Sequence, residues 1–191
     1  MSNKERQLRA MNDKIVYSIP LKNEKVIKIR QGAFGSGEHE TTIACLKHLQ
    51  KMDLKNKTVL DIGCGTGILG IASSILGASF CVGFDPSYSA CETALFCNNL
   101  NKINNNHIVC GYNDSINGKF DIVVANIYQD ILINLCQYIN NSLKNSGITL
   151  LSGIPIEYNF DVKKCYENSG FKVLDLNIHD EYSTILLKKG G

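Results

Sequence analysis

Apolar and polar positions alternate along the chain in short blocks, and these blocks predict strands and helices in alternating order. Short apolar runs bounded by Gly, Asn or Asp predict buried strands, whereas longer stretches with apolar residues three or four positions apart predict amphipathic helices. The predicted strands span residues 57–62, 80–85, 107–110, 122–125, 148–152, 171–178 and 182–188, and the predicted helices span residues 67–77, 87–101, 130–144 and 160–169. This order predicts an α/β fold: a parallel sheet with helices on both faces and a ligand site at the carboxyl ends of its strands.

The end of the chain departs from that alternation. Only the short segment HDEYS, with no helix, joins the last two predicted strands. Strands that are joined without a crossover run antiparallel. We therefore expect these two strands to form an antiparallel hairpin at one edge of the sheet.

The most informative motif follows the first strand of the predicted sheet. Residues 58–67 read TVLDIGCGTG, so that an apolar strand carrying Asp61 near its end is followed by glycine at positions 63, 65 and 67. Glycine lets a strand turn sharply into a helix and lets backbone N–H groups approach a ligand, because it has no Cβ. The second strand ends in Asp85, where an acid can accept both hydroxyls of a ribose. The pattern predicts a cofactor that contains a nucleoside.

Two classes of cofactor fit this turn. Gly65, Gly67 and Gly70 have the G-x-G-x-x-G spacing of dinucleotide sites, so a nicotinamide cofactor is the alternative. In such a site Asp61 would stand near a pyrophosphate, and like charges a few ångströms apart repel by about 1 kcal/mol in water and by more in a partly dry cleft. S-adenosylmethionine has no phosphate, and Asp61 would attract its ammonium and sulfonium. The residues therefore favour adenosylmethionine.

A glycine turn of this kind combined with a terminal antiparallel hairpin is typical of class I S-adenosylmethionine-dependent methyltransferases and not of nicotinamide-binding Rossmann domains. We expect their fold, a seven-stranded and mostly parallel sheet with an antiparallel edge hairpin and helices on both faces. In this part of the chain the expected cofactor-binding residues are Asp61, Gly63, Gly65 and Asp85.

A second segment, GAFGSGEHETT at residues 32–42, precedes the sheet. Its small residues around Phe34 make a loop that is able to close over a ligand. Thr42 stands where a helix begins, and hydroxyls at a helix start can bind a cofactor carboxylate. We expect Phe34 and Thr42 to contact the cofactor. The triplet EHE at 38–40 is not expected to bind a metal, because adjacent residues rarely chelate one ion together.

A third segment, FDIVVANIYQD at residues 120–130, ends the fourth strand at Asn126. This position places a side-chain carbonyl beside the methyl group to be transferred. Methyl transfer is an in-line displacement in which positioning provides most of the catalysis, and a carbonyl can orient an amine through its N–H and ease the growing positive charge. Asn126 is the expected catalytic residue and a further cofactor contact; a turn-forming Asn without a chemical role is the alternative.

Composition and charge limit the class of protein. The chain has 191 residues, of which 44% are hydrophobic, enough for one full core. We expect a basic amino-terminal extension with a helix and short strands at residues 1–30 and a catalytic domain at residues 31–191. Residues 1–57 hold 12 Lys and Arg against 6 acids, and residues 58–191 hold 8 against 12. The basic segment at residues 1–57 is either a docking face for an acidic or RNA-containing partner or a solvated surface.

The same composition predicts a cytoplasmic protein. The charged start MSNKERQLRAMNDK has no apolar signal segment, and no stretch is apolar enough to span a membrane. The 8 cysteines include no C-x-x-C pair, so we expect reduced core residues. Direct readout of nucleic acid is not expected, since Asn126 is followed by Ile127 and Tyr128 and not by the N-P-P-Y that grips a flipped base. The sequence carries no indication of an oligomeric state.

Taken together, the motifs resemble the catalytic domain of the PrmA family, lysine methyltransferases that act on a ribosomal protein. The likeness covers about residues 30–189. It rests on four segments in order: Ala33–Thr42, Val59–Leu69, Ala125–Tyr128 and Leu151–Pro155. The resemblance implies a protein N-methyltransferase for a lysine or amino-terminal amine, with S-adenosylhomocysteine as product. It also implies that Thr42, Gly63, Asp85 and Asn126 contact the cofactor and that Asn126 faces the acceptor amine.

Some features depart from the family. Only some 30 residues precede the loop where members carry a recognition domain, so a small-molecule N-methyltransferase and a non-catalytic adenosylmethionine binder remain alternatives. Tyr128 and Pro155 replace leucines, and we expect Tyr128 to line the acceptor pocket, where a ring face attracts an ammonium by about 0.5 to 2 kcal/mol. An amine must lose a proton before it is methylated, so the rate should rise between about pH 7 and 9.

Overall fold

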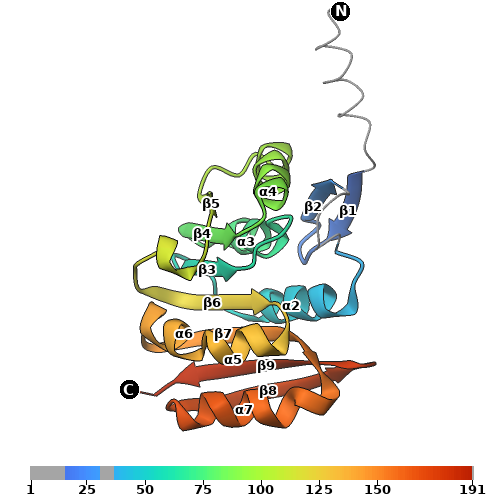
Figure 1. The fold of residues 1–191 in the computed structure, drawn as a ribbon. Helices are drawn as coiled ribbons and strands as arrows, with labels where there is room; N and C mark the ends of the chain where they lie inside the picture. The colour runs from blue at the N-terminus through green and yellow to red at the C-terminus, as the bar shows by residue number, and fades with distance from the viewer. Residues whose placement is uncertain (1–15, 31–36, 191) are drawn as a thin grey trace, which may run out of the picture.

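The computed structural model describes residues 16–30 and 37–190, and its main feature is a seven-stranded sheet with helices on both faces (Figure 1). The strands of this sheet are β3 (Thr58–Ile62), β4 (Phe80–Asp85), β5 (Asn106–Cys110), β6 (Phe120–Asn126), β7 (Leu143–Pro155), β8 (Phe171–His179) and β9 (Tyr182–Lys189). Their order across the sheet is β5-β4-β3-β6-β7-β9-β8. The first five run parallel, and β9 pairs antiparallel with both β7 and β8. The predicted fold class and terminal hairpin are confirmed.

Helices cover the sheet in two layers. They are α2 (Glu40–Lys51), α3 (Ile68–Ile75), α4 (Tyr88–Leu100), α5 (Gln129–Asn134), α6 (Cys136–Ser142) and α7 (Asn159–Asn168), with short turns η1 (Asn113–Ser115) and η2 (Ile156–Tyr158). Successive residues of β3 point to opposite faces, as the period of two in a strand requires. Val59 packs in one core cluster with α2 and α3, whereas Leu60 packs in a second cluster with α5, α6 and α7. Both side chains are fully buried.

The stretch predicted as one helix over residues 130–144 differs in the structure. It forms α5 and α6, which are separated at Leu135, and the chain joins β7 at Leu143. The reason is tertiary: Leu143 is drawn into the sheet opposite Phe120, where only 1% of it is exposed. That pairing also makes β7 longer than the predicted strand at residues 148–152. Local apolar spacing could not show that Leu143, near the end of the predicted helix, would pair with a strand of the sheet.

The amino-terminal part of the described chain forms a small hairpin of β1 (Val16–Pro20) and β2 (Val26–Arg30). Ile27 and Ile29 on β2 are fully buried in the same core cluster as α2 and α3. The side chain of Asn101 ties the hairpin to the end of α4, because it binds both the N–H and the carbonyl of Lys28, at 2.8 and 2.7 Å. The division of the chain at residue 30 stays a prediction.

Two features of the sequence can be compared directly with the structure. Within the described residues, no helix is both long and apolar enough to cross a membrane. All eight cysteines carry free thiols. Six of them are buried, Cys165 is half-buried and Cys110 is exposed.

Candidate functional site

The glycine turn after β3 is held against the neighbouring strand. The N–H of Gly63 donates to the carbonyl of Phe84 at 2.9 Å. Gly63, Gly65 and Gly67 have φ angles of 66°, 53° and 75°, in the left-handed region that favours glycine. A Cβ at Gly63 would stand 2.5 Å from Cγ2 of Ile127, so the turn and the end of β6 are in direct contact. The backbone therefore requires the glycines that the sequence motif supplies.

Asp85 closes the turn from the end of β4. Its Oδ2 accepts a hydrogen bond from the N–H of Gly65 at 3.0 Å, and its Oδ1 accepts one from the N–H of Ser87 at 2.9 Å. Ser87 in turn caps α4, since its hydroxyl accepts from the N–H of Ala90. Asp85 is half-buried, so part of its carboxylate faces solvent at the carboxyl edge of the sheet. The position matches that expected of a ribose-binding acid.

Asp61 lies behind the turn rather than on its surface. Only 2% of the residue is exposed, and its Oδ2 accepts a hydrogen bond from the N–H of Gly70 in α3 at 3.1 Å. Burial raises the pKa of this carboxyl to about 7; the Gly70 hydrogen bond acts in the opposite direction, and the nearby Asp85 raises the pKa further. Asp61 thus fixes the start of α3 and adds negative character beneath the turn.

The charges around the turn suit a cationic ligand better than a phosphate. The sequence has no Lys or Arg between Lys57 and Lys102, a segment that contains β3, the whole turn, α3, β4 and α4. Asp61 and Asp85 are close enough for the charge of one to affect the pKa of the other. A pyrophosphate here would lie near the Asp85 carboxylate, and this segment supplies none of the cations that dinucleotide and phosphate sites use. This arrangement fits a sulfonium and an ammonium.

Asn126 and Thr42 meet on the other side of the site. The Nδ2 of Asn126 donates to the hydroxyl of Thr42 at 3.3 Å. Thr42 lies in the first turn of α2, and only 1% of it is exposed. His39 caps this helix, because its ring Nδ1 accepts from the N–H of Thr41 at 3.4 Å. With Nδ2 directed at Thr42, the carbonyl oxygen of Asn126 remains as an acceptor for a substrate N–H.

Two residues without an assigned role in the sequence motifs complete this part of the site. Ile127 covers Gly63, and Gly153 leaves room for the Asn126 amide. Gly153 has a φ of 79°, and a Cβ there would stand 2.8 Å from the carbonyl of Ile127 and 3.1 Å from Oδ1 of Asn126. The signal that could have revealed Gly153 is its place in the segment Leu151–Pro155, directly after a parallel strand.

The structure therefore brings the expected site residues together in two groups, Asp61, Gly63, Gly65 and Asp85 on one side and Thr42 and Asn126 on the other. Contact between Gly63 and Ile127 joins the groups. Phe34 lies outside the described residues. No cluster of three or more His, Cys, Asp or Glu side chains that could hold a metal occurs in residues 16–30 and 37–190.

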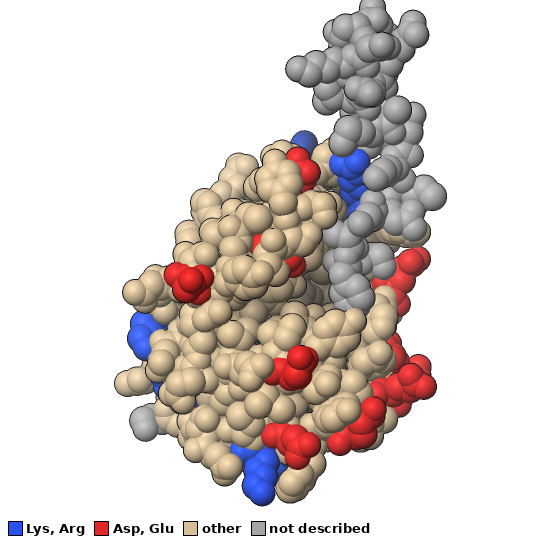
Figure 2. Space-filling model, in the orientation of Figure 1, with Lys and Arg blue, Asp and Glu red and all other residues tan. Residues whose placement is uncertain are grey.

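Exposed aromatic side chains lie in the segments that follow β6 and β7, just before α5, in η2 and at the start of α7. Tyr128, Tyr158 and Phe160 expose 65%, 42% and 68% of their surfaces. The exposed acids Glu157 and Asp161 stand between and beside them in the sequence. In Figure 2 the face shown is mostly uncharged in its centre, with acidic side chains spread across its lower part and along one edge. Tyr128 thus stands two residues after Asn126 with an exposed ring, and the segment after β7 carries two further exposed rings and two acids.

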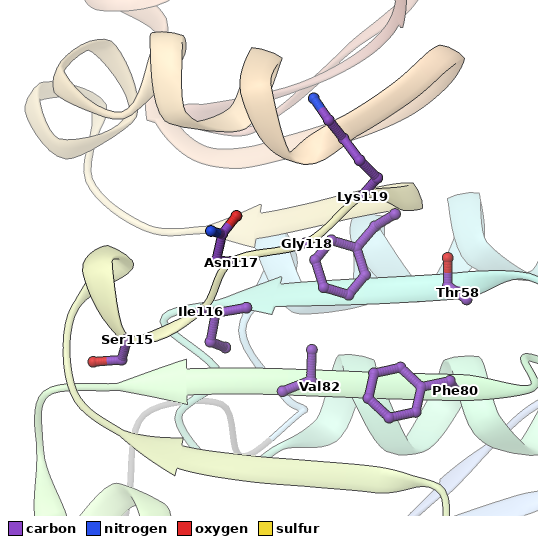
Figure 3. A pocket seen from close by; sticks show the side chains of 9 residues that line it. Thr58, Phe80, Val82, Ser115, Ile116, Asn117, Gly118 and Lys119 are labelled. Atoms are coloured by element: carbon purple, nitrogen blue, oxygen red, sulfur yellow. The ribbon is translucent and has the colours of Figure 1, made fainter.

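A separate pocket of about 410 Å³ lies on the sheet face that carries α5, α6 and α7 (Figure 3). Thr58 and Phe80, the first residues of β3 and β4, line one end of it, and residues 115–119 pass over the strands (Figure 3). The glycine turn follows the last residue of β3, Ile62, so the pocket begins at the opposite end of that strand. This pocket is not the cofactor edge of the sheet.

The strand order, the glycine turn and the acid after β4 define the fold of class I S-adenosylmethionine-dependent methyltransferases. Within this class the chain belongs to the family described as Ribosomal protein L11 methyltransferase (PrmA), whose model matches residues 13–190. The family expected from the four sequence motifs is confirmed.

Individual relatives agree with this assignment. The chain is 40% identical over 172 residues to a ribosomal protein L11 methyltransferase of Clostridium botulinum strain Alaska E43. The matched region covers 89% of this chain and 55% of the relative. A ribosomal protein L11 methyltransferase from Caldanaerobacter subterraneus is 38% identical over 174 residues, which cover 90% of this chain and 56% of the relative. The chain thus spans about half the length of the curated relatives it matches.

Solved structures give the same result. A crystal structure of a ribosomal protein L11 methylase from Lactobacillus delbrueckii superposes with a TM-score of 0.83 at 26% identity, covering 92% of this chain and 90% of that one. A T. thermophilus 16S rRNA N2 G1207 methyltransferase in complex with AdoMet and guanosine has a TM-score of 0.75 at 19% identity, covering 92% of this chain and 50% of that one. The second likeness concerns the fold alone.

Proposed function

We propose that the chain binds S-adenosylmethionine at the carboxyl edge of β3, β4 and β6 and transfers its methyl group to an amine of a protein, leaving S-adenosylhomocysteine. The observation that carries this proposal is the convergence of the glycine turn, the Asp85 carboxylate and the Asn126 amide on one edge of the sheet. Family membership and the lack of Lys and Arg between Lys57 and Lys102 support adenosylmethionine over a dinucleotide.

Each residue has a defined part in holding the cofactor. The carboxylate of Asp85 accepts the ribose hydroxyls, and the backbone at Gly63 and Gly65 lies against the ligand because no Cβ intervenes. The Thr42 hydroxyl at the start of α2 binds the amino acid carboxylate. When bound, adenosylmethionine supplies a methyl group made electrophilic by its sulfonium.

Asn126 orients the acceptor. Its Nδ2 is held by Thr42, so its Oδ1 has a fixed direction toward an amine N–H and eases the positive charge that the nitrogen gains. A lysine amine with an ordinary pKa near 10.4 must first lose a proton, which costs about 5 kcal/mol at neutral pH. Apolar surroundings reduce this cost because they disfavour the ammonium.

The acceptor class we propose is a lysine or amino-terminal amine of a ribosomal protein, in the cytoplasm. The names of the relatives support this choice, and so do the exposed ring of Tyr128 after β6 and the exposed rings and acids after β7. An aromatic face and nearby carboxylates attract a cationic side chain. Cofactor and acceptor then approach the same amide from two sides.

The proposal is tested with the purified chain, methyl-labelled adenosylmethionine and lysate of the source cells. We expect label in the protein fraction, and in ribosomal protein when isolated ribosomal proteins replace the lysate. The variant Asn126→Ala serves as the inactive control. Label in the nucleic-acid or small-molecule fraction contradicts the proposed acceptor, and the absence of Asn126-dependent label contradicts catalysis.

The pH profile gives a second test of the acceptor. If an amine is methylated, the rate at saturating cofactor rises between about pH 7 and 9, because a larger share of the acceptor is unprotonated. A flat profile over this range would exclude an amine whose deprotonation limits the rate.

A further inference from the structure

Cys91 and Cys110 lie side by side at the cofactor edge of the sheet. Cys91 is in the first turns of α4 and is 4% exposed, whereas Cys110 is the last residue of β5 and is exposed. The Cys110 thiol lies 4.0 Å from the carbonyl of Pro86, and the Cys91 thiol contacts the carbonyl of the preceding residue, Asp85. The two cysteines come from elements that are separate in the sequence, so the pair exists only in the folded chain.

Backbone contacts locate both thiols independently. The Cys91 thiol donates to the carbonyl of Asp85 at 3.3 Å and lies 3.7 Å from the carbonyl of Val109. The N–H of Gly111 donates to the same Asp85 carbonyl at 3.1 Å. The Cys91 thiol and the N–H of Gly111 thus share the Asp85 carbonyl, and Cys110 stands opposite Asp85 in the pairing of β4 with β5.

We propose that Cys91 and Cys110 form an oxidation site, in which closure to a cystine weakens the binding of adenosylmethionine. The link to the cofactor rests on the proposed role of Asp85. Oxidation removes the S–H that Cys91 donates to the Asp85 carbonyl. A cystine also restricts the separation of its two Cα atoms, which ties the start of α4 to the end of β5. The start of α4 supplies the Ser87 N–H that holds Oδ1 of Asp85.

The chemistry proceeds by thiol–disulfide exchange with a small disulfide such as oxidised glutathione. The exposed Cys110 attacks first, forms a mixed disulfide and releases one glutathione thiolate. Cys91 then attacks the Cys110 sulfur, which releases the second glutathione; the two thiol protons end on the two glutathione molecules. Burial, the thiol contact with Cys110 and nearby negative charge raise the pKa of Cys91 to about 11, although its bond to the Asp85 carbonyl lowers it. The buried thiol is therefore suited to resolve the mixed disulfide and not to react first.

The chain offers a matched control pair. Cys136 at the start of α6 lies beside Cys165 of α7, because the Cys136 thiol is 3.8 Å from the Cys165 carbonyl and donates to the Ser169 hydroxyl at 3.3 Å. This pair packs with the core cluster on the sheet face of α5, α6 and α7. Helix α4, which carries Cys91, lies on the opposite face, since its residue Cys97 packs in the other cluster. Oxidation there leaves the contacts of Asp85 unchanged.

The experiment treats the reduced full chain with oxidised glutathione, maps cystines by mass spectrometry and titrates S-adenosylhomocysteine by calorimetry. We expect a cystine between Cys91 and Cys110 and an affinity that falls by roughly 3- to 10-fold, the loss that accompanies one hydrogen bond. Dithiothreitol should restore the affinity. Cys110→Ser should abolish the response, and Cys165→Ser should leave it intact.

Two results would overturn the inference. One is a glutathione adduct on Cys110 that never resolves to a cystine. The other is a Cys91–Cys110 cystine with unchanged affinity for S-adenosylhomocysteine. Failure of the reduced chain to bind S-adenosylhomocysteine would count against the proposed function instead, because the cystine map is read without any cofactor.

Discussion

The amide of Asn126 at the end of β6 donates to the hydroxyl of Thr42 at the start of α2 across 84 residues of sequence, with 3.3 Å between the two atoms. This bond holds the amide through its nitrogen, and in the proposed function the carbonyl oxygen receives the acceptor amine. It connects the helix that precedes the sheet to the strand that carries the expected catalytic group. The position of Asn126 at the strand end alone would leave its side chain free to rotate.

Asn126→Ala should lower kcat by about 100-fold or more, because it removes a group aimed at the reacting nitrogen. Thr42→Val should have a smaller effect, about 3- to 10-fold, since the amide stays but loses one hydrogen bond that orients it. Single-turnover methylation at saturating cofactor measures both. Thr42→Ser retains the hydroxyl and should remain close to the unaltered chain. Near-normal kcat in Asn126→Ala would exclude the catalytic role.

Gly63→Ala should weaken cofactor binding and destabilise the fold by about 1 to 3 kcal/mol, because a Cβ at a φ of 66° is strained and meets Ile127 at 2.5 Å. Calorimetric titration and urea unfolding measure the two effects. Adding Ile127→Ala removes the clash but not the backbone strain, so recovery should be partial. Gly118→Ala is the control, since its Cβ would lie 3.4 Å from the Phe120 ring in ordinary contact. Equal effects at positions 63 and 118 would contradict the argument.

Asp61 should make stability depend on pH in the neutral range. Its carboxyl has a pKa near 4 in the unfolded chain and about 7 in the folded one, where burial is the main cause. The unfolded chain therefore releases this proton at lower pH, and the free energy of unfolding should fall as pH rises from about 4 to 7. Asp61→Asn should remove this contribution, which amounts to about 1 to 4 kcal/mol at pH 8.

Urea unfolding at pH 5 and pH 8 checks the prediction for Asp61. Asp130→Asn, at an exposed position at the start of α5, is the control and should leave the difference between the two pH values unchanged. If Asp61→Asn shows the same difference as the unaltered chain, burial does not govern this carboxyl.

Tyr128→Ala should raise KM for a lysine acceptor by about 2- to 30-fold without a matching change in kcat, because a ring face attracts an ammonium by about 0.5 to 2 kcal/mol. The side chain is 65% exposed beside Asn126, so its removal should not disturb the core. Tyr128→Phe retains the ring and should behave like the unaltered chain. Tyr112→Ala, at an equally exposed tyrosine after β5, is the control. An unchanged KM in Tyr128→Ala would refute the acceptor role.

The sequence was sufficient for those features that depend on neighbours in the chain. The apolar runs at β3 and β4 and the glycines after Ile62 could be read directly, because strand alternation and positive φ are local properties. Asp85 could be read in the same way, because it directly follows the apolar run of β4 in the sequence. These features were enough to predict the class I methyltransferase fold and to propose the edge of the sheet that binds the cofactor.

Long-range packing decided the rest. Leu143 pairs with Phe120 in the sheet, and the predicted helix is divided into α5 and α6 at Leu135. Packing also places Ile127 over Gly63 and joins Asn126 to Thr42. It also buried Asp61, which was expected to attract the cofactor as a carboxylate, and burial raises the pKa of this carboxyl. Spacing along the chain determines which face a residue occupies. Which distant side chain it meets there depends on the order and twist of strands that only the folded sheet fixes.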